Sequence, residues 1–549
     1  MKIAIAQPNP TVGDLSGNRK KVEEAVARAS DAGAELVVLP EMVLTGYPPM
    51  DLLSREGFVN DQMRELERLH TASRTIPILL GAVVRLDEQQ PQPLANAAVL
   101  LAGGGTLAVR PKSLLPSYDV FDERRHFSPA KTRSPVALPG NGISLGLTVC
   151  EDAWGSDVPY DIDPVTELVR EGADILFNLS ASPWHVGKPR ERREMLSRLA
   201  RTHATPLVFV NQVGGNDELI FDGGSFAVDS RGEFLGGLPP FEPGFGVIEV
   251  PSGSGTTGKA VELTDLEAAH ELETGLVLGI HDYFSKQNLP PNAVVGLSGG
   301  IDSAVTAHLA VMALGPEKVL GVAMPGPFSS EHSLSDALKL GRSLGIEIRT
   351  VDIRPLYEAY LSVFTDLFGE RDDYGITQQN VQSRIRGNIL MAISNQDQRL
   401  VLATGNKSEL SLGYCTLYGD TVGGIAVLGD VYKRDVYALA HQANRDSERI
   451  PWNTIEKPPS AELAPDQVDA NDLPPYDLVD AILEQAIEGQ AGRQAISLPS
   501  GCAPETAQSI LRRLDGNEYK RRQSPLVLRT SRKAFGSGRR LPIVHGFET

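Results

Sequence analysis

Three residues with reactive side chains each stand at the end of an apolar run in the first half of the chain. Glu41 closes ELVVLPE, Lys112 closes LAVRPK and Cys150 closes ISLGLTVC. A thiol attacks a carboxamide only as its thiolate, so it needs a nearby base, which a carboxylate can provide. An ammonium group can stabilise the oxyanion that forms. Together the three predict amide hydrolysis with release of ammonia, although each alone is also an ordinary structural residue.

A glycine-rich segment, GLSGGIDS, occupies Gly296–Ser303 in the second half of the chain. It follows the apolar run AVVGL and precedes the helical pattern AVTAHLAVMAL. Glycines let backbone N–H groups approach phosphate oxygens, and a helix N-terminus adds partial positive charge. Ser298 and Ser303 add hydroxyl donors, and Asp302 is either a magnesium ligand or a favourable first-turn acid. Because no GK[ST] follows, this is not the phosphate loop of kinases and GTPases.

The composition argues against some classes of function. The formal net charge of −18 disfavours nucleic acid and membrane surfaces as partners, because both require a basic surface. Three cysteines are too few for a disulfide framework, so a reducing compartment, the cytoplasm, is expected. We expect no secretory signal, and no apolar run is long enough to span a bilayer.

The last 49 residues reverse this charge. Residues 501–549 carry ten Lys and Arg against four acidic residues. Such a segment is commonly a solvated tail or a subunit contact, and a phosphate-facing surface is the alternative.

Two series of α/β elements are expected, on either side of a Gly/Ser/Thr-rich stretch at 251–259. The second series is typical of a doubly wound parallel sheet, and in layered α/β folds chemistry collects beyond the carboxyl ends of strands. The expected strands of the first series are Lys2–Ala6, Glu35–Leu39, Ile78–Val84, Ala97–Leu101, Ser144–Val149, Asp174–Phe177 and Leu207–Val210, with helices at Asn18–Ala32 and Arg190–His203. The second series begins with a helix at Leu263–Gln287 and continues with strands at Asn292–Leu297, Val319–Met324, Glu347–Asp352 and Leu400–Ala403.

The first half resembles the nitrilase superfamily in its glutamine-amidase branch. The resemblance rests on LPEMVLTGYPPMDLL, RPKSLLPSYDVFDERRHF and VCEDAW, which contain the three reactive residues in order. It implies an α-β-β-α sandwich over residues 1–252, with Glu41, Lys112 and Cys150 catalytic and Glu123 orienting the lysine. It also implies a glutamine pocket that contains Tyr118, Ser182 and Lys188. Without the resemblance, Tyr118 is a packing aromatic and Lys188 a solvated cation.

The second half resembles the ATP pyrophosphatase superfamily, which splits ATP between its α and β phosphates. QNVQSRIRG, ATGNKSELSL and KPPSAEL narrow the likeness to NAD synthetases over residues 265–549, with 253–264 as linker. The resemblance implies a Rossmann-like ATP pyrophosphatase domain that uses ATP as co-substrate and Mg²⁺. The ATP-binding residues it implies are Gly296, Leu297, Ser298, Gly299, Gly300, Ile301, Asp302, Ser303 and Thr404. Asn380, Glu409 and Lys520 would bind deamido-NAD, and Asp302 and Glu409 would hold the metal.

The sequence alone does not decide the roles of two groups of residues in the second half. Arg384 and Arg386 are further substrate candidates, although an amphipathic helix face explains them nearly as well. In the adenine loop MPGPFSS, Phe328 replaces an expected tyrosine and Gly326 a usual small polar residue. We expect the phenyl ring still to stack on adenine.

The expected activity is amidation of deamido-NAD, driven by ATP, with ammonia drawn from glutamine or taken up free. The resemblance implies at least a dimer, formed through the second halves, and a sheltered route for ammonia. Three alternatives remain: an amidotransferase that makes a different amide, an ammonia-only synthetase with an inert first domain, and a regulatory protein without turnover. The intact reactive residues argue against the last, and QNVQSRIRG and KPPSAEL against the first.

Overall fold

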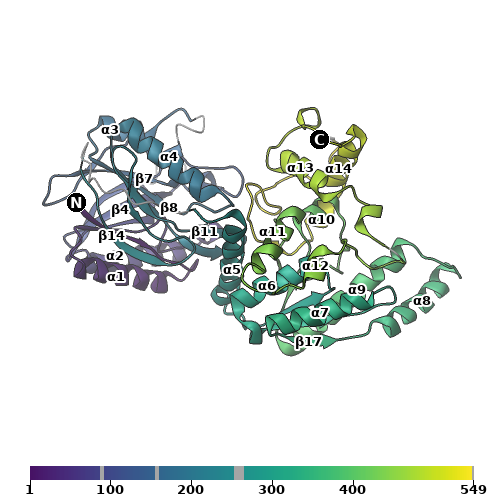
Figure 1. Cartoon of the computed structure of the whole chain (residues 1–549). Helices are drawn as coiled ribbons and strands as arrows, with labels where there is room; N and C mark the ends of the chain where they lie inside the picture. The colour runs from purple at the N-terminus through teal and green to yellow at the C-terminus, as the bar shows by residue number, and fades with distance from the viewer. Residues whose placement is uncertain (87–91, 155–159, 253–264, 466, 547–549) are drawn as a thin grey trace. The chain divides into compact units, whose positions relative to one another are not determined.

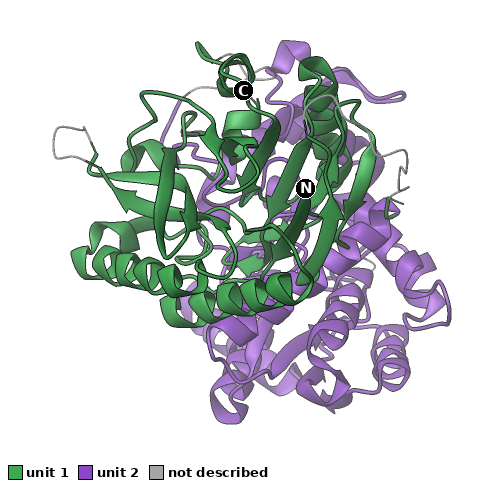
Figure 2. Ribbon diagram, turned by 90° about the vertical axis from the view of Figure 1, so that its left-hand side faces the viewer, with its two compact units in different colours: residues 1–266 green, residues 267–549 purple. Residues whose placement is uncertain are grey.

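The computed structural model describes residues 1–86, 92–154, 160–252, 265–465 and 467–546. The chain divides into two compact units, residues 1–266 and 267–549 (Figures 1 and 2). The linker expected at 253–264 lies outside the described residues. No helix in the described part of the chain is long and apolar enough to cross a membrane.

Two six-stranded sheets form the centre of unit 1, with strand orders β14-β1-β2-β3-β4-β5 and β13-β12-β9-β8-β7-β6. Apolar side chains from both sheets, among them Ile5, Val38, Leu147 and Phe177, share one buried cluster between them. The strands of the first sheet are β1 (Lys2–Gln7), β2 (Leu36–Val38), β3 (Ile78–Arg85), β4 (Leu94–Ala102), β5 (Gly105–Pro111) and β14 (Gly244–Glu249). Those of the second are β6 (Val136–Ala137), β7 (Ser144–Val149), β8 (Ile175–Ser180), β9 (Leu207–Asn211), β12 (Phe226–Val228) and β13 (Phe234–Gly237), and β10 (Val213–Asn216) pairs with β11 (Leu219–Asp222) in a separate ribbon.

A pair of helices packs on the outer face of each sheet. Helices α1 (Leu15–Asp31) and α2 (Glu56–Ala72) share a buried cluster with the first sheet, and α3 (Pro164–Arg170) and α4 (Lys188–His203) with the second. The sequence of helix α1 explains both its start and its packing. The Asp14 side chain caps the helix by accepting from the Gly17 N–H, and the buried residues of the helix recur at helical spacing, so that they form one face. The α-β-β-α sandwich predicted from the sequence is confirmed.

Three short 3₁₀ turns complete the described elements of unit 1. They are η1 (Met50–Ser54), η2 (Glu123–Arg125) and η3 (Cys150–Trp154). The last two carry candidate site residues, and η3 begins where β7 ends.

A six-stranded, fully parallel sheet in the order β17-β16-β15-β18-β19-β20 forms the centre of unit 2. The doubly wound sheet predicted for this half is therefore confirmed. The order reverses between β15 and β18, where the carboxyl ends of strands leave room for a ligand. Its strands are β15 (Ala293–Leu297), β16 (Val319–Ala323), β17 (Glu347–Thr350), β18 (Leu400–Ala403), β19 (Ile425–Ala426) and β20 (Leu526–Val527).

Helices surround this sheet, and several more belong to the C-terminal part of the chain (Figure 1). Those that precede β19 in the chain are α5 (Ala268–Lys286), α6 (Ile301–Leu314), α7 (Glu331–Leu344), α8 (Arg354–Phe368), α9 (Ile376–Asp397) and α10 (Lys407–Leu412). Those that follow it are α11 (Lys433–Ala443), α12 (Trp452–Glu456), α13 (Tyr476–Ile487), α14 (Pro504–Gly516) and α15 (Glu518–Arg521). Single 3₁₀ turns lie at η4 (Pro316–Lys318), η5 (Asp469–Asn471) and η6 (Arg493–Ala495).

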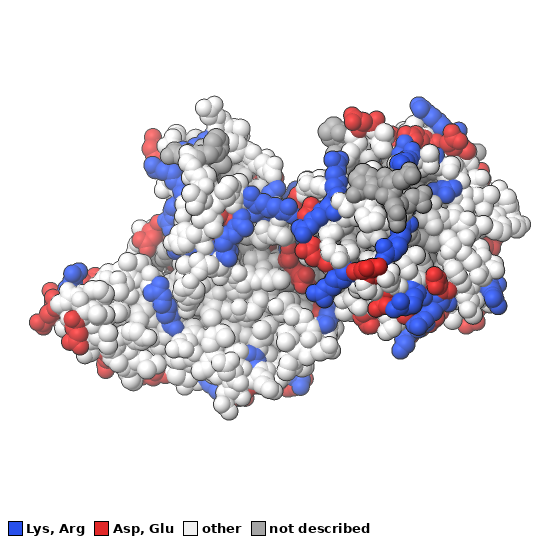
Figure 3. Space-filling view, turned by 180° about the vertical axis from the view of Figure 1, so that it is seen from behind, with Lys and Arg blue, Asp and Glu red and all other residues white. Residues whose placement is uncertain are grey.

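The basic C-terminal segment is folded onto unit 2 rather than solvated along its length. Arg521, Arg529 and Arg539 are buried, and Arg521 and Arg539 both contact the Glu518 carboxylate, at 2.9 and 2.5 Å. Burial of paired guanidinium groups fixes this segment in place. On the face drawn in Figure 3, acidic and basic side chains are intermingled.

Candidate active sites

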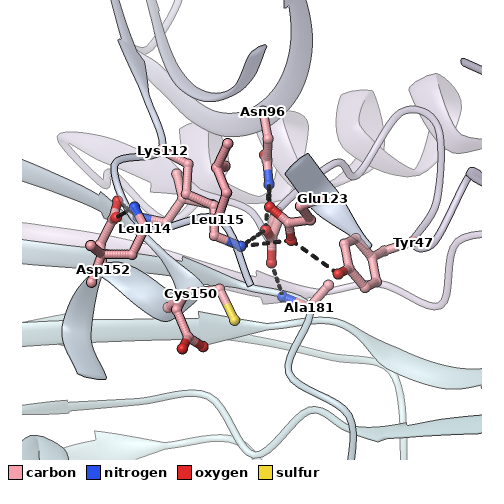
Figure 4. A network of polar contacts seen from close by, with 12 residues as sticks. Tyr47, Asn96, Lys112, Leu114, Leu115, Glu123, Cys150, Asp152 and Ala181 are labelled. Carbon is pink, nitrogen blue, oxygen red and sulfur yellow. Dashed lines mark hydrogen bonds and ion pairs between the residues drawn. The ribbon is translucent and has the colours of Figure 1, made fainter. Parts of the chain in front are cut away.

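The three reactive residues of unit 1 follow three different strands and lie together. Glu41 comes three residues after β2, Lys112 directly after β5 and Cys150 directly after β7. The Lys112 ammonium donates to Glu41 Oε1 at 2.9 Å and to Glu123 Oε1 at 2.8 Å. The Cys150 side chain lies beside this group (Figure 4). All four side chains are at most 6% exposed, so their charges interact with little screening by water.

Glu41 is held by two donors besides the lysine. Asn96 Nδ2 donates to Glu41 Oε1 at 2.6 Å, and the Ala181 N–H donates to Glu41 Oε2 at 2.7 Å. Both carboxylate oxygens therefore have partners, which fixes the side chain in one orientation. Asn96, the third residue of β4, is a site residue that the sequence analysis did not predict.

Burial and charge set the protonation of this cluster. Burial raises the pKa of Glu123 to about 7, with Lys112 opposing this and Glu41 adding to it. Burial alone would lower the pKa of Lys112, but Glu123 and Glu41 hold it well above its ordinary value. Tyr47 also donates to Glu123 Oε1, at 3.0 Å. The lysine is thus a permanent cation, while Glu123 changes charge near neutral pH.

The titration of Glu123 predicts a pH dependence for unit 1. Below about pH 7 the Glu123 carboxyl gains a proton and holds the Lys112 ammonium less firmly, so amide hydrolysis should slow as pH falls. Glu123→Gln, which is neutral at every pH, should remove this inflection and lower the rate by roughly 10- to 100-fold. Glutamate release measured from pH 5.5 to 8.5 tests this, and an unchanged inflection in the variant would contradict it.

Cys150 lies in a strained turn with a protonated thiol. Its φ is +43°, in the left-handed region that non-glycine residues seldom adopt. Burial raises the pKa of the Cys150 thiol well above its ordinary value, Glu41 raises it further and Lys112 lowers it. The resting thiol therefore needs a base at the moment of attack, and Glu41 is the carboxylate with the largest influence on it.

The predicted glutamine-binding residues all lie close to the reactive residues. Tyr118 donates through its hydroxyl to Glu151 Oε1 at 2.8 Å, next to Cys150, and Tyr160 donates to the same oxygen at 2.8 Å. Lys188 begins α4 and places its ammonium 4.0 Å from the ring centre of Trp154, the last residue of η3. Ser182 follows Ala181 and is buried. Glu151 and Tyr160 are additional candidates that sequence reasoning missed.

A cavity of about 770 Å³ opens at the carboxyl ends of β15 and β18 in unit 2. It is lined by every ATP-, metal- and deamido-NAD-binding residue predicted for this half except Gly299. Of the two further arginine candidates Arg386 lines it and Arg384 does not; Arg384 Nε donates instead to the Leu417 carbonyl at 3.2 Å. Gly299 has φ +79°, and a Cβ there would lie 2.4 Å from the Ser333 carbonyl oxygen, so only glycine fits.

The Gly296–Ser303 segment forms a tight loop into the N-terminus of α6. Ser303 Oγ donates to the Gly300 carbonyl at 3.0 Å and accepts from the Ser298 N–H at 3.3 Å. The Gly300 N–H donates to Ser298 Oγ at 3.2 Å. These hydrogen bonds hold the loop at the N-terminus of α6, a helix of 14 residues. The positive end of the helix dipole makes this loop suitable for binding a phosphate group.

Asp302 and Glu409 lie on either side of a buried lysine. Lys433 Nζ is 2.5 Å from Asp302 Oδ2 and 3.8 Å from Glu409 Oε1. Asn406 caps α10, accepts from the Glu409 N–H and donates to Asp302 Oδ1 at 2.8 Å. Burial, followed by the Asp302 charge, raises the pKa of Glu409 to about 8, while Lys433 opposes this. Lys433 is a further candidate site residue, which the sequence did not predict.

The carboxylates of Asp302 and Glu409 are the type of ligand that magnesium prefers. Mg²⁺ commonly uses one or two carboxylates and completes its shell with phosphate oxygens and water. Among the described residues, no group of three or more His, Cys, Asp or Glu is arranged to hold a metal by itself. Asp302 and Glu409 would therefore supply part of the shell, and phosphate oxygens and water the rest.

The other predicted residues line the same cavity from separate elements. Asn380 lies on α9 and accepts from the Thr416 hydroxyl at 2.8 Å, and Thr404 follows β18. Lys520 lies on α15 and donates to the Gly413 and Cys415 carbonyls at 2.7 and 2.8 Å. Arg386 also lines the cavity, and its Nε donates to the Met324 carbonyl at 3.0 Å.

Phe328 does not line the cavity, in contrast to the stacking role expected for it. Its ring packs edge-on against Tyr357 at 6.5 Å between centroids, because an apolar phenyl group joins the buried cluster there. Met324, Pro325 and Ser329 of the same loop line the cavity instead. A Cβ on Gly326 would lie 3.0 Å from the Arg386 guanidinium, so this position accepts only a small residue.

Comparison with known proteins identifies both halves. The family model for carbon-nitrogen hydrolases matches residues 2–259, and that for NAD synthase matches residues 273–524. The fold and the two sites thus define a carbon-nitrogen hydrolase joined to an NAD synthase.

Relatives match this chain from end to end. The chain is 43% identical to a glutamine-dependent NAD(+) synthetase of Synechocystis sp., over 99% of each chain, and 38% identical to that of Thermotoga maritima, over 100% and 99%. The solved structure of glutamine-dependent NAD(+) synthetase from Acinetobacter baumannii in complex with adenosine diphosphate matches with a TM-score of 0.76 at 36% identity, covering 99% of this chain and 98% of that one. This chain belongs to the family of glutamine-dependent NAD(+) synthetases.

Proposed function

We propose that this enzyme hydrolyses glutamine in unit 1 and uses the ammonia in unit 2 to convert deamido-NAD to NAD, with ATP cleaved to AMP and pyrophosphate. The observation that supports the proposal is the presence of two sites in one chain. They are the buried Glu41–Lys112–Cys150 cluster of unit 1 and the cavity of unit 2, which is lined by the glycine-rich loop and Asp302. The experiment that tests it compares glutamine with ammonia as nitrogen donor, with ATP and deamido-NAD present.

In the first reaction Cys150 is the nucleophile. Glu41 accepts the thiol proton as Sγ attacks the carboxamide carbon of glutamine, and the Lys112 ammonium stabilises the oxyanion. The C–N bond breaks, the proton passes to the leaving nitrogen and ammonia departs, leaving a thioester. Glu41 then takes a proton from water, which attacks the thioester. The C–S bond breaks, glutamate leaves, and the proton returns from Glu41 to Cys150 Sγ. Glu123 orients Lys112 through the 2.8 Å contact described above.

Recognition of glutamine is assigned to residues around η3. Lys188 suits the α-carboxylate, while Tyr118 and Ser182 offer hydroxyl groups. The Glu151 carboxylate, which orients Tyr118 and Tyr160, adds negative charge beside the pocket. A zwitterionic substrate matches a site with one cation and one anion.

In the second reaction the cavity of unit 2 binds ATP and deamido-NAD. The N–H groups and hydroxyls of Gly296–Ser303 hold the phosphates, and Thr404 directly follows β18, the strand on the other side of the switch point. The nicotinate carboxylate attacks the α phosphorus and pyrophosphate leaves. Ammonia then attacks the acyl carbon, and AMP departs as the amide forms. Asn380, Glu409 and Lys520 are assigned to deamido-NAD.

Mg²⁺ is assigned to Asp302 and Glu409. When bound, the ion neutralises charge on the phosphates of ATP. Lys433 lies between the two carboxylates and balances their charge. Burial lowers the pKa of Lys433, but Asp302 and Glu409 raise it well above its ordinary value, so it remains a cation.

We further propose that the enzyme is at least a dimer and works in the cytoplasm. All three cysteines are free, which suits a reducing compartment. Helix α8 lies at the edge of unit 2 and buries only Tyr357 (Figure 1). Leu356, Tyr360, Val363 and Leu367 are 44 to 66% exposed at helical spacing, which makes an apolar face suited to a second copy.

A charge on this face should weaken self-association. Leu367→Asp would place a carboxylate in the interface and should raise the dissociation constant by at least about 30-fold, because an unpaired charge is costly to bury. Ser362→Asp adds the same charge to α8 away from the apolar face and is the matched control. Light scattering after gel filtration measures the mass of each variant. An unchanged mass for Leu367→Asp across a dilution series would refute this interface.

A further inference from the structure

A single buried carboxylate joins the two segments that carry the lysine and the cysteine of unit 1. Asp152 is 3% exposed and lies in η3, two residues after Cys150. Its Oδ1 accepts from the N–H groups of Ser113 and Leu114, at 2.9 and 2.8 Å, and its Oδ2 from the N–H of Val149, at 3.0 Å. These donors are the two residues after Lys112 and the one before Cys150. Asp152 and Leu114 lie against each other in Figure 4.

The cysteine turn is fixed on its other side as well. Asn178 Nδ2 donates to the Cys150 carbonyl at 3.1 Å, and Ser180 Oγ donates to Asn178 Oδ1 at 2.7 Å. The strained backbone at Cys150 is therefore bonded both before and after the residue. Such strain persists only where surrounding bonds hold it.

The two clamped segments belong to different sheets. Lys112 follows β5 of the first sheet, and Cys150 follows β7 of the second. The main packing between these sheets is apolar and non-directional, so it does not set the position of a charged atom to within a fraction of an ångström. Three charge-assisted hydrogen bonds to one carboxylate are directional and strong.

We propose that Asp152 is a positioning residue for glutamine hydrolysis, which sets the place of the Lys112 ammonium relative to the Cys150 thiol by tying their backbone segments together. This inference rests on the proposed glutaminase role of unit 1. It assigns to Asp152 no contact with substrate. Misplacement by about 1 Å of a group that stabilises a transition state costs on the order of 100-fold in rate.

Asp152→Asn tests the inference with little change in volume. An amide offers one acceptor oxygen, so its NH₂ group must face at least one of the three N–H donors. Asp174→Asn is the matched control: the Asp174 carboxylate accepts from the Ser144 N–H at 2.8 Å, at the opposite end of β7. Asp152→Glu, which keeps the charge but lengthens the side chain, serves as a second variant should Asp152→Asn fail to fold.

Two readouts separate positioning from a general loss of structure. For Asp152→Asn we expect kcat of glutamate release to fall at least about 30-fold with KM within about threefold. We also expect alkylation of Cys150 by iodoacetamide at pH 8, followed by peptide mass spectrometry, to slow about tenfold, because withdrawal of Lys112 removes what lowers the thiol pKa. Asp152→Glu should show both effects in weaker form, and Asp174→Asn neither.

The inference is overturned by a folded Asp152→Asn that keeps kcat and the alkylation rate within about threefold of the parent. Should Asp152→Asn not fold, a folded Asp152→Glu with kcat and alkylation rate both equal to those of the parent overturns it. It is equally overturned if Asp174→Asn loses kcat to the same extent. Cys150→Ala, run in the same assay, distinguishes this failure from failure of the proposed function. Glutamate release that survives Cys150→Ala rejects the glutaminase assignment itself, whereas release lost in Cys150→Ala but normal in Asp152→Asn rejects only the positioning role.

Discussion

Replacing Cys150 with alanine is expected to abolish NAD formation from glutamine and to leave NAD formation from ammonia within about twofold. Removal of the nucleophile leaves no thioester route, and losses of this kind in nucleophilic enzymes are on the order of 10⁴-fold or more. All the described residues that line the cavity of unit 2 belong to that unit, and Cys150 is not among them. The measurement is the rate of NAD formation with each nitrogen donor at saturating ATP and deamido-NAD.

Cys502→Ala is the matched control for this experiment. Cys502 is a free, partly exposed cysteine that does not line the cavity, so its removal should leave both rates unchanged. Glutamine-driven synthesis that persists in Cys150→Ala would show that the nucleophile is assigned wrongly. Loss of the ammonia-driven rate as well would instead mean that the two reactions are not separable as proposed.

Replacing Asp302 with alanine is expected to have the converse effect. AMP and NAD formation should fall by roughly 10³-fold or more, because Asp302 is the carboxylate proposed to hold Mg²⁺ beside the pyrophosphate and it also holds the Lys433 ammonium in place. Glutamate release from unit 1 should continue, since its catalytic side chains lie in another compact unit. AMP and glutamate are measured in the same reaction mixture.

The control replaces a carboxylate of unit 2 that lies away from the cavity. Asp352 is exposed and pairs with Arg354 at 2.6 Å, so Asp352→Ala should leave AMP formation intact. AMP formation that survives in Asp302→Ala would refute the metal role. A parallel loss of glutamate release would indicate that the two units turn over only together.

The architecture could be predicted where a buried strand forms an apolar run bounded by turn residues. The strands expected at Ser144–Val149 and Leu400–Ala403 coincide with β7 and β18, because buried strands carry continuous apolar runs that end at turn residues. The strands β10 to β14 were not anticipated. They are three to six residues long and several contain glycine, so they leave no alternating pattern.

The reactive residues could be found from the sequence, but their supports could not. Glu41, Lys112 and Cys150 end recognisable segments, and the structure brings them together. Asn96 lies inside an apolar strand, and Asp152 acts through backbone N–H groups 38 and 39 residues away. Contacts over such separations are a property of the folded sheets and have no local signature. Lys433 of unit 2 could not be predicted for the same reason, because only the fold places it between Asp302 and Glu409.

The departure at Phe328 has a similar origin. A loop motif indicates which segment lies near a ligand, but it does not decide which side chain turns inward. The apolar cluster around Tyr357 takes up the phenyl ring, and Met324 and Pro325 line the cavity in its place.

The transfer of nitrogen from glutamine to NAD tests the central claim most directly. The enzyme is given glutamine labelled with ¹⁵N at the side-chain amide, together with ATP, Mg²⁺ and deamido-NAD, and the products are followed by mass spectrometry. The proposed reaction predicts ¹⁵N in the carboxamide of NAD, with AMP formed in step with NAD and glutamate released. Unlabelled NAD, or NAD formed without AMP, would contradict it.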